Sequence, residues 1–449
     1  MKEKIFFTGA IFFFILMNIQ LQIPGNPQET EALKLIRGPY LQSGTQTSIV
    51  IKWRTNITSD SRVVFGTQPD NLDESKNVDT KSKDHEILID GLEENTKYYY
   101  MIGNSDQLYF KPDPSYYFIT APSENYNKTI RIWAIGDFGL GHPLQELVKK
   151  GYMKYRGDHQ TDVWLMLGDI AYFYGEEYEF QRGIFDGFYS DIMRNTVIWA
   201  TPGNHDMRSA DSGRGSGAYY EVFTLPVNGE AGGEPSGTEA YYSFNYGDIH
   251  FISMDSEDTP LDTDGEMARW LQRDLENDDH YWKIVIFHHP VYTRGTHNSD
   301  NDRDSGGRMT KMRENFLPIL EEHGVDLVMG GHSHAYERSY LLKDHYGYSS
   351  EFDPDRMIIR NENAKKKDKS AFVKKKDNRG TVYVVCGVSG GHVLDGTCDH
   401  PAMAVCSTQY HGSMAIEVKD NLLSAALVDE YGKVRDSFTI TKEVSIPAF

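Results

Sequence analysis

The chain has 449 residues, enough for two or three domains, and 39% of them are hydrophobic while 25% are charged. These proportions are typical of a soluble globular protein and exclude a chain that is largely disordered or membrane-spanning. The formal net charge of −20 argues against nucleic acid as a partner, because proteins bind phosphate backbones through basic surfaces. A small anionic substrate stays open, since bound metal cations can dominate the field of a site.

The first residues are typical of an export signal. Lys2 and Lys4 precede an almost unbroken apolar run from Ile5 to Met17, which is shorter than the roughly 20 residues of a membrane span. The pattern predicts a signal peptide over residues 1–24 and a secreted protein, periplasmic or extracellular. Because a clean small-x-small cleavage site is missing, an uncleaved N-terminal anchor is the alternative.

Short strand-like runs separated by turn residues fill residues 34–121. Ser48–Trp53, Ser61–Phe65 and Glu86–Ile89 are rich in β-branched or aromatic residues, and the region shows no helical periodicity. We therefore expect an all-β sandwich domain of immunoglobulin or fibronectin type. The stretch from Gly91 to Tyr100 resembles the turn and tyrosine-rich strand of fibronectin type III modules.

After a polar linker, residues 129–442 alternate apolar runs with amphipathic helical segments. This alternation predicts an α/β domain with buried strands. The expected helices are Pro143–Tyr155, Glu266–Leu275 and Met309–Glu322. The expected strands, in chain order, are Ile130–Ile135, Val163–Leu167, Thr196–Ala200, His250–Met254, Lys283–Phe287, Asp326–Met329 and Thr381–Val385.

The C-terminal third contains a long polar stretch, Ser339–Arg379, with the lysine runs Lys365–Lys367 and Lys374–Lys376. We expect a solvated insert here, and a basic collar that recruits anionic substrates is the alternative.

Of three cysteines in the chain, at most one pair can form a disulfide, and Cys398 with Cys406 is the predicted pair because they are close in sequence.

Residues that commonly bind metals follow five of the predicted strands. Because ligands bind beyond the carboxyl ends of strands in open α/β sheets, we expect these residues to share one crevice. A Gly-Asp pair alone is more often an ordinary turn and each histidine pair alone is ambiguous, whereas Gly-Asn-His-Asp is much rarer. The joint occurrence of the motifs after successive strands is what specifically indicates a site. The segments are Gly136-Asp137, Gly168-Asp169 with Tyr172, Gly203-Asn204-His205-Asp206, His288-His289-Pro290 and Gly331-His332-Ser333-His334.

The donor groups in these five segments suit the same class of metal ions. Carboxylate, phenolate, amide and imidazole groups suit hard-to-borderline transition metals such as iron, manganese and zinc. Seven candidate ligands exceed the four of a tetrahedral zinc site, but they suit two metals that share one bridging carboxylate. Two metals about 3.5–4 Å apart can clamp a phosphoryl group and generate hydroxide near neutral pH.

In this order the five blocks resemble the signature of purple acid phosphatases within the calcineurin-like metallophosphoesterases. The signature reads Gly-Asp, Gly-Asp-x-x-Tyr, Gly-Asn-His-Asp, Val-x-x-His and Gly-His-x-His, and the fourth block is Val285 to His288 here. Plant-type members carry a fibronectin-like domain in front, so the resemblance covers about Lys34 to Phe438. It implies a catalytic domain of two packed mixed sheets flanked by helices, with the site at one rim.

The resemblance also implies a dinuclear metal centre, Fe(III) plus a divalent ion that is iron, zinc or manganese. Asp169 would bridge the two ions, and Tyr172 would mark the family because its phenolate favours ferric iron and colours the protein. The implied ferric ligands are Asp137, Asp169, Tyr172 and His334. The implied ligands of the divalent ion are Asp169, Asn204, His288 and His332.

Substrate-binding residues follow from the same resemblance. His205 would hold the phosphate next to Asn204 and would be oriented by Asp206, while His297 would face the leaving group. Many relatives have a second histidine after this one, where the chain has Asn298. An amide cannot donate a titratable proton, so we expect His297 to act as the acid alone beside Asn298. His289 has no role in the signature and is interpreted as structural.

The expected activity is hydrolysis of a small phosphate monoester, in which a metal-bound hydroxide attacks phosphorus in line and His205 and His297 stabilise the developing charge. A phosphodiesterase or nucleotide-directed hydrolase on the same dinuclear site is one alternative. An adhesion or carbohydrate-binding protein with a vestigial metal centre is another. We expect no nucleic-acid partner, and a membrane contact only through the N-terminal segment.

Overall fold

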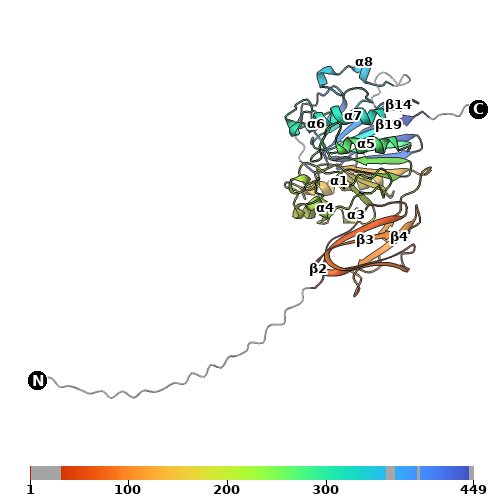
Figure 1. Ribbon diagram of the computed structural model, residues 1–449, viewed down its shortest axis with the longest axis vertical. Helices are drawn as coiled ribbons and strands as arrows, with labels where there is room; N and C mark the ends of the chain where they lie inside the picture. Colours follow the sequence, from red (N-terminus) through yellow and green to blue (C-terminus); the bar gives the residue numbers. More distant parts are fainter. Residues whose placement is uncertain (2–31, 361–369, 392–394, 444–449) are drawn as a thin grey trace, which may run out of the picture. The chain divides into compact units, whose positions relative to one another are not determined.

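The computed structural model describes Met1 and residues 32–360, 370–391 and 395–443. Apart from Met1, the predicted signal peptide or anchor lies outside the described residues. Among the residues that are described, no helix is both long and apolar enough to cross a membrane. The ribbon from Lys34 onward forms one compact unit (Figure 1).

The N-terminal domain is a β-sandwich, as predicted. The long strand β2 pairs with β3 along most of its length, but its first half also pairs with β1 and its second half with β4. Trp53 from the first half of β2, Phe65 from its second half and Tyr98 from β4 all belong to one hydrophobic core. The strands are β1 (Leu35–Gln42), β2 (Ser48–Gly66), β3 (Glu74–Asp90), β4 (Lys97–Gly103) and β5 (Tyr117–Ile119).

Two mixed sheets make up the catalytic domain, and this prediction is also confirmed. The first sheet has the parallel strands β6 (Ile130–Ile135), β7 (Val163–Met166) and β8 (Val197–Ala200) at its centre. It continues on the β6 side through β17 (Gly412–Lys419), β18 (Leu422–Asp429), β19 (Val434–Lys442) and β14 (Ala371–Lys374). The second sheet, in spatial order, is β16 (Met403–Ser407), β13 (Tyr336–Ser339), β15 (Val382–Cys386), β12 (Leu327–Gly330), β11 (Trp282–Ile286), β10 (Ile249–Ser253) and β9 (Tyr242–Tyr246).

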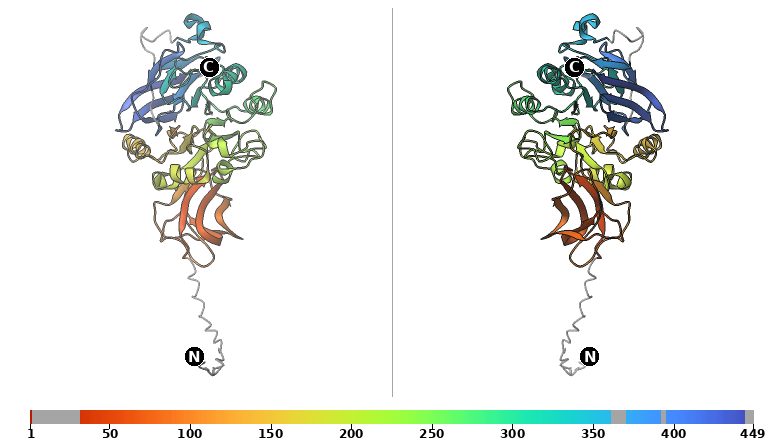
Figure 2. Two further views of the ribbon diagram at one scale, coloured as in Figure 1. Left: turned by 90° about the vertical axis from the view of Figure 1, so that its left-hand side faces the viewer. Right: turned by 90° about the vertical axis from the view of Figure 1, so that its right-hand side faces the viewer.

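A single core of buried side chains joins the two sheets, with residues such as Trp164 from the first and Phe251 from the second. Helix α1 packs against the first sheet, and α5 is tied to the second through Asp274, so helices flank the pair (Figure 2). The helices are α1 (Pro143–Arg156), α2 (Glu177–Phe180), η1 (Gln181–Phe185), α3 (Ser190–Met193), η2 (Asp206–Ser209), α4 (Ala218–Val222), α5 (Glu266–Glu276), η3 (Asp304–Gly307), α6 (Arg308–Lys311), η4 (Met312–Phe316), α7 (Leu317–Glu322), η5 (Ser349–Glu351) and α8 (Pro354–Met357).

The seven predicted strands all form, and their ends differ from the prediction by no more than one residue. Two predicted helices correspond to α1 and α5. The third, Met309–Glu322, is instead a run of α6, the π-helical η4 and α7. Pro318 lies in the first turn of α7 and lacks the N–H that would continue regular α-helical bonding from the preceding turn.

Strand β1 joins the sandwich to the first catalytic sheet. Leu41 pairs with Val197 of β8, and the hydroxyl of Tyr40 donates to the carbonyl of Val222 at 2.8 Å. The ring of Tyr40 belongs to the core of the catalytic domain, not to that of the sandwich. The two regions therefore have separate cores but share a strand contact.

Part of the lysine-rich insert is buried, which corrects the expectation of a fully solvated segment. Lys374 has no exposed side-chain surface, and its Nζ lies 2.7 Å from Oδ1 of Asp326. Lys442 approaches the other oxygen of Asp326 at 2.8 Å. Burial lowers the pKa of Lys374 to about 8 against the opposing effect of the Asp326 carboxylate. The run Lys365–Lys367 lies outside the described residues.

The predicted disulfide is confirmed. Cys398 and Cys406 are bonded, and Cys386 is a buried free thiol at the end of β15. Burial raises the pKa of the Cys386 thiol to about 12, so this cysteine is a packing residue and not a reactive one.

Candidate metal centre

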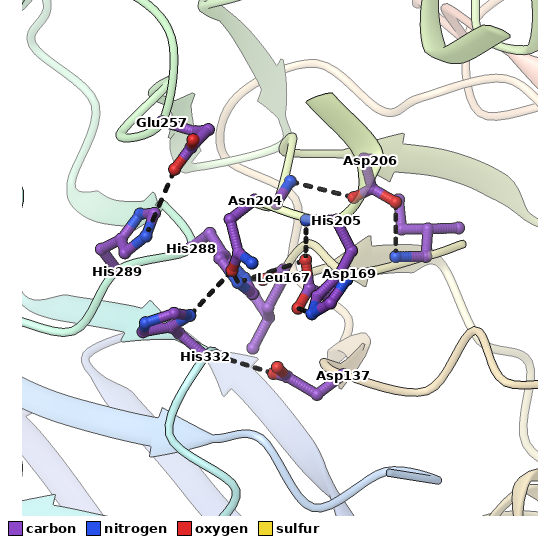
Figure 3. A network of polar contacts seen from close by, with 12 residues as sticks. Asp137, Leu167, Asp169, Asn204, His205, Asp206, Glu257, His288, His289 and His332 are labelled. Atoms are coloured by element: carbon purple, nitrogen blue, oxygen red, sulfur yellow. Dashed lines mark hydrogen bonds and ion pairs between the residues drawn. The ribbon is translucent and has the colours of Figure 1, made fainter. Parts of the chain in front are cut away.

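The structure brings the seven predicted ligands together beyond the carboxyl ends of five strands. Three come from the loops after β6 and β7 in the first sheet and one from the loop after β8, while the other three follow β11 and β12 of the second sheet. Figure 3 shows five of these side chains, Asp137, Asp169, Asn204, His288 and His332, converging from both sheets. The residues are Asp137, Asp169, Tyr172, Asn204, His288, His332 and His334.

Tight backbone geometry places several of these groups. Asp137, Asp169 and His332 have positive φ angles of 54°, 52° and 64°, which are unfavourable for residues other than glycine and recur at functional sites. The neighbouring glycines leave room for the ligands. A Cβ atom on Gly331 would lie 2.2 Å from Oδ2 of Asp137, and one on Gly203 would lie 2.2 Å from the main-chain nitrogen of Asp169.

One group of donor atoms surrounds the hydroxyl of Tyr172. This hydroxyl lies 3.0 Å from Oδ2 of Asp169, 3.3 Å from Oδ1 of Asp137 and 3.5 Å from Nε2 of His334. The His334 and Asp137 atoms are 3.4 Å apart. Burial, together with the carboxylates of Asp169 and Asp137, raises the pKa of Tyr172 well above its ordinary value. A phenolate would therefore form here only beside a cation.

A second group of donor atoms surrounds the amide oxygen of Asn204. This oxygen lies 3.1 Å from Nε2 of His288 and 2.9 Å from Nδ1 of His332. Oδ1 of Asp169 is 3.4 Å from the same nitrogen of His288. Asp169 thus turns one carboxylate oxygen to each group of donors.

The contacts of His288 favour a cation within this second group of donor atoms. Its Nδ1 lies 2.8 Å from the carbonyl of Leu167, so Nδ1 carries the donated hydrogen and Nε2 turns a lone pair toward two oxygens. Burial disfavours a charge, but the Asp169 carboxylate outweighs it and raises the pKa of His288 to about 10. Either a proton or a metal ion must lie among these atoms. The donor set fits one metal in each group, with Asp169 between them.

His205 stands beside the first group, but Asp206 does not orient it. Nε2 of His205 is 3.9 Å from Oδ2 of Asp169, while its Nδ1 lies 2.9 Å from the carbonyl of Phe173. The Asp206 carboxylate instead accepts N–H bonds from Gly203 and from the main chain after Asp169, which braces the two ligand loops (Figure 3). The prediction for Asp206 is therefore wrong, and the orienting group is the Phe173 carbonyl.

His297 lies beside His332 of the second group of donor atoms. Its ring stacks on that of His332 at 4.0 Å between centroids, and its Nδ1 is 2.8 Å from Oδ1 of Asp304. Asn298 is exposed, and its amide oxygen accepts the N–H of Asp300 within the same loop. Of these two predicted substrate residues, His297 is the one directed by a carboxylate.

His289 is fully buried, in keeping with its structural interpretation. Its Nδ1 lies 2.9 Å from the hydroxyl of Ser256, and its Nε2 lies 3.5 Å from Glu257. Burial and the nearby His288 lower the pKa of His289 well below its ordinary value, which favours the neutral ring.

Comparison with known proteins follows the same division of the chain. Residues 130–336 match the calcineurin-like phosphoesterase family, and residues 37–120 match the N-terminal domain of purple acid phosphatases. The chain thus contains a calcineurin-like phosphoesterase domain, preceded by a purple acid phosphatase N-terminal domain.

Curated relatives of this chain include a phosphoenolpyruvate phosphatase from Allium cepa, 28% identical over 346 residues that are 72% of this chain and 66% of that protein. Purple acid phosphatase 15 from Arabidopsis thaliana is 26% identical over 60% of this chain and 51% of its own length. The chain thus spans about half to two thirds of these relatives.

Solved structures show the same fold. Purple acid phosphatase PPD1 from yellow lupin (Lupinus luteus) matches with a TM-score of 0.67 at 18% identity, over 90% of this chain and 74% of that one. PhoD matches with a TM-score of 0.62 at 14% identity, over 90% of both chains.

Three residues beside the candidate centre could not be identified from the sequence. Asp304 contacts His297, Glu257 contacts His289, and Ser305 has its hydroxyl 2.6 Å from Nε2 of His332. Glu257 lies in a loop, Asp304 and Ser305 lie in the short helix η3, and all three are outside the five signature blocks. The only local signal was the cluster of acidic residues from Asn298 to Asp304, which by itself is typical of a surface turn.

Proposed function

We propose that the chain hydrolyses phosphate monoesters at a dinuclear centre of Fe(III) and a divalent ion. The observation that carries the proposal is the carboxylate of Asp169, which turns Oδ2 to the Tyr172 group and Oδ1 to the His288 group. A phenol hydroxyl stands in the first group only, and this matches a harder trivalent ion there and a divalent ion in the second.

Both groups would be needed for the chemistry. Asp137, Asp169, Tyr172 and His334 would hold the first ion, and Asp169, Asn204, His288 and His332 the second. When bound, the two ions would supply Lewis-acid polarisation of the phosphoryl oxygens and a nucleophile that is active near neutral pH.

His205 would bind the phosphoryl group. Its Nδ1 faces the Phe173 carbonyl and therefore keeps a hydrogen, which leaves Nε2 on the side of Asp169. The protonated ring can donate Nε2–H to a phosphoryl oxygen and so stabilise negative charge that grows in the transition state.

His297 would supply the proton to the leaving alcohol. Asp304 accepts from Nδ1, which fixes the ring and leaves Nε2 as the atom that can reach a substrate. Because the ring also stacks on His332, its position relative to the candidate centre is defined from two sides. The poor leaving groups of alkyl esters are the ones that need this acid.

The proposal includes the domains and the location. Residues 34–121 would form a separate sandwich module and residues 129–442 the catalytic domain, with a small phosphate ester as substrate. Export is supported by Lys2, Lys4 and the apolar run that follows them, and by the disulfide Cys398–Cys406, which persists in oxidising compartments.

Metal quantification with a visible spectrum, followed by a panel of esters, tests this function. Two metals per chain, one of them iron, and a higher kcat/KM for p-nitrophenyl phosphate than for bis-p-nitrophenyl phosphate are expected. A higher kcat/KM for the diester would favour the phosphodiesterase alternative. Purified protein that binds no metal after loading would contradict a dinuclear enzyme altogether.

A further inference from the structure

Aromatic side chains are exposed directly beside the candidate centre. Phe173 is 53% exposed and Tyr174 is 60% exposed, although Phe173 follows the fully buried candidate ligand Tyr172 in sequence. The Phe173 ring lies edge to face with the ring of His205, with 6.1 Å between centroids. Exposed aromatic groups that adjoin a site are typical of binding surfaces.

The main chain beneath these rings is held in place. The carboxylate of Glu179, itself 2% exposed, accepts the N–H groups of both Phe173 and Tyr174, the second at 2.7 Å. From the other side, Nδ1 of His205 and Nη1 of Arg208 lie 2.9 Å and 3.1 Å from the Phe173 carbonyl. The exposed rings therefore sit on a fixed loop, which lowers the conformational entropy that a ligand would cost on binding.

A cation completes this surface. Arg208 is exposed, and its guanidinium lies 5.8 Å from the centroid of the Tyr174 ring. Aromatic side chains and a planar guanidinium stack favourably on a planar ring of a ligand. An aliphatic ligand group would be stabilised on the same surface only by the removal of its apolar area from water.

The exposed aromatic surface begins next to the candidate centre. Nε2 of His205 lies 3.9 Å from Oδ2 of Asp169, and the ring of Phe173 lies against the ring of His205. A phosphoryl group held by His205 would leave the alcohol part of its ester within reach of Phe173.

We propose that Phe173, Tyr174 and Arg208 form a subsite for the alcohol part of the ester, and that this subsite selects alcohols with a planar aromatic ring. The inference rests on the proposed function, because it takes the phosphoryl group to bind beside His205.

Two matched pairs of esters separate aromatic recognition from chemistry. In 2-phenylethyl and 2-cyclohexylethyl phosphate, and in the 4-phenylbutyl and 4-cyclohexylbutyl homologues, the leaving groups are primary alcohols of nearly equal size. Turnover of these esters by the full, metal-loaded chain tests the proposed function. Calorimetric Kd values for the corresponding phosphonates, which cannot be hydrolysed, test the subsite.

The wild-type protein should bind the aromatic phosphonate of at least one pair roughly three- to tenfold more tightly than its cyclohexyl partner, as expected for an aromatic contact. Phe173→Leu and Phe173→Ala should bring this ratio close to one, and Tyr174→Ala should reduce it. Tyr431→Ala, which removes an equally exposed tyrosine on the turn between β18 and β19, should keep the wild-type ratio.

Equal Kd values within both pairs would overturn the subsite, as would a preference that survives in the double variant Phe173→Ala/Tyr174→Ala with normal metal content. Normal turnover without an aromatic preference would refute the subsite alone. An aromatic preference in the phosphonates without turnover of any ester would refute the proposed function and keep the subsite.

Discussion

The hydroxyl of Tyr172 donates to Oδ2 of Asp169 at 3.0 Å. This contact places a phenol and a carboxylate oxygen next to each other in a fully buried environment, where two negative charges would repel strongly. Such a pair is stable as two anions only with a cation beside it, so the two residues report directly on metal binding.

Asp169→Asn should lose metal as well as turnover. The variant removes the negative charge that both donor groups share, while it keeps the size of the side chain. Elemental analysis should find well under two metals per chain, and kcat/KM should fall at least about 100-fold. Asp191→Asn, which only breaks a contact with Lys149 outside the centre, is the matched control. Two metals per chain and normal turnover in Asp169→Asn would refute the bridging role.

Tyr172→Phe should remove the colour of the iron-loaded protein. A phenolate bound to ferric iron absorbs visible light by charge transfer, and no other ligand of the proposed set can produce that band. Phenylalanine keeps the ring, and Asp137, Asp169 and His334 still hold the ion, so iron content should change little. Tyr174→Phe, two residues further along the loop, should stay coloured. Colourless wild-type protein with oxidised iron would leave Tyr172 as a packing residue.

His297→Ala should slow alkyl phosphates about 10²–10⁴-fold more than activated aryl phosphates, because only the poor leaving groups need an acid. Asp304→Asn should show a smaller loss with the same dependence on the leaving group, since the carboxylate only orients His297 through Nδ1. The measurement is kcat/KM across a series of esters with different leaving groups. If both ester types lost rate equally, His297 would position the substrate instead of protonating it.

Removal of the sandwich should leave the metal centre functional but should lower the stability of the remaining domain. A chain that begins near Asn125 keeps every proposed ligand but loses β1, whose Tyr40 packs in the catalytic core. We expect a folded truncation to retain its metals and to have a lower Tm. In the full chain, Tyr40→Ala should lower the free energy of unfolding by about 3 kcal/mol or more. A truncation that is folded by circular dichroism yet binds no metal would show that the sandwich completes the centre.

Glu337 should make stability depend on pH. It is fully buried on β13, and burial raises its pKa to about 7, against bonds from the Thr293 hydroxyl and the Arg294 N–H. The folded state therefore holds this proton more tightly than the unfolded state, whose pKa is near 4.5. The free energy of unfolding should fall as pH rises from about 4.5 to about 7, by at most about 3 kcal/mol.

Glu337→Gln isolates this effect. The difference in unfolding free energy between variant and wild type, from urea titrations between pH 4.5 and 7.5, should shift in favour of the variant as pH rises. Glu417→Gln, a substitution on the surface of β17, should show no such trend. A constant difference between Glu337→Gln and wild type would mean that Glu337 keeps an ordinary pKa.

The strands and the candidate ligands could be predicted because both depend on local sequence. A buried parallel strand is a continuous apolar run, and the residue that follows it must lie at the sheet edge where Asp137 and Asp169 are found. The pairing of Cys398 with Cys406 was equally local.

The remaining features depend on partners far away in sequence. Lys374 belongs to a run of charges that is typical of a solvated loop. Its burial is made favourable by the Asp326 carboxylate, which directly precedes β12 of the other sheet, and by the carbonyls of Gly324 and Val325. Asp206 was expected to orient its neighbour His205, but the chain turns so that the carboxylate faces the N–H groups after Asp169. Directions of side chains in loops follow from such contacts and are not encoded in spacing.

The position of β6 in the first sheet has a consequence for folding. This strand, which leads into Asp137, lies between β7 and the much later β17, and the side chains of Arg131 and Glu417 that meet across this pair are 286 residues apart in sequence. Closing so long a loop is slow, because the chain must lose the conformational entropy of the loop before the contacts between β6 and β17 compensate for that loss. The metal centre should therefore mature only after the last strands have left the ribosome, and chains that end before Gly412 should expose β6 as an unpaired edge and aggregate.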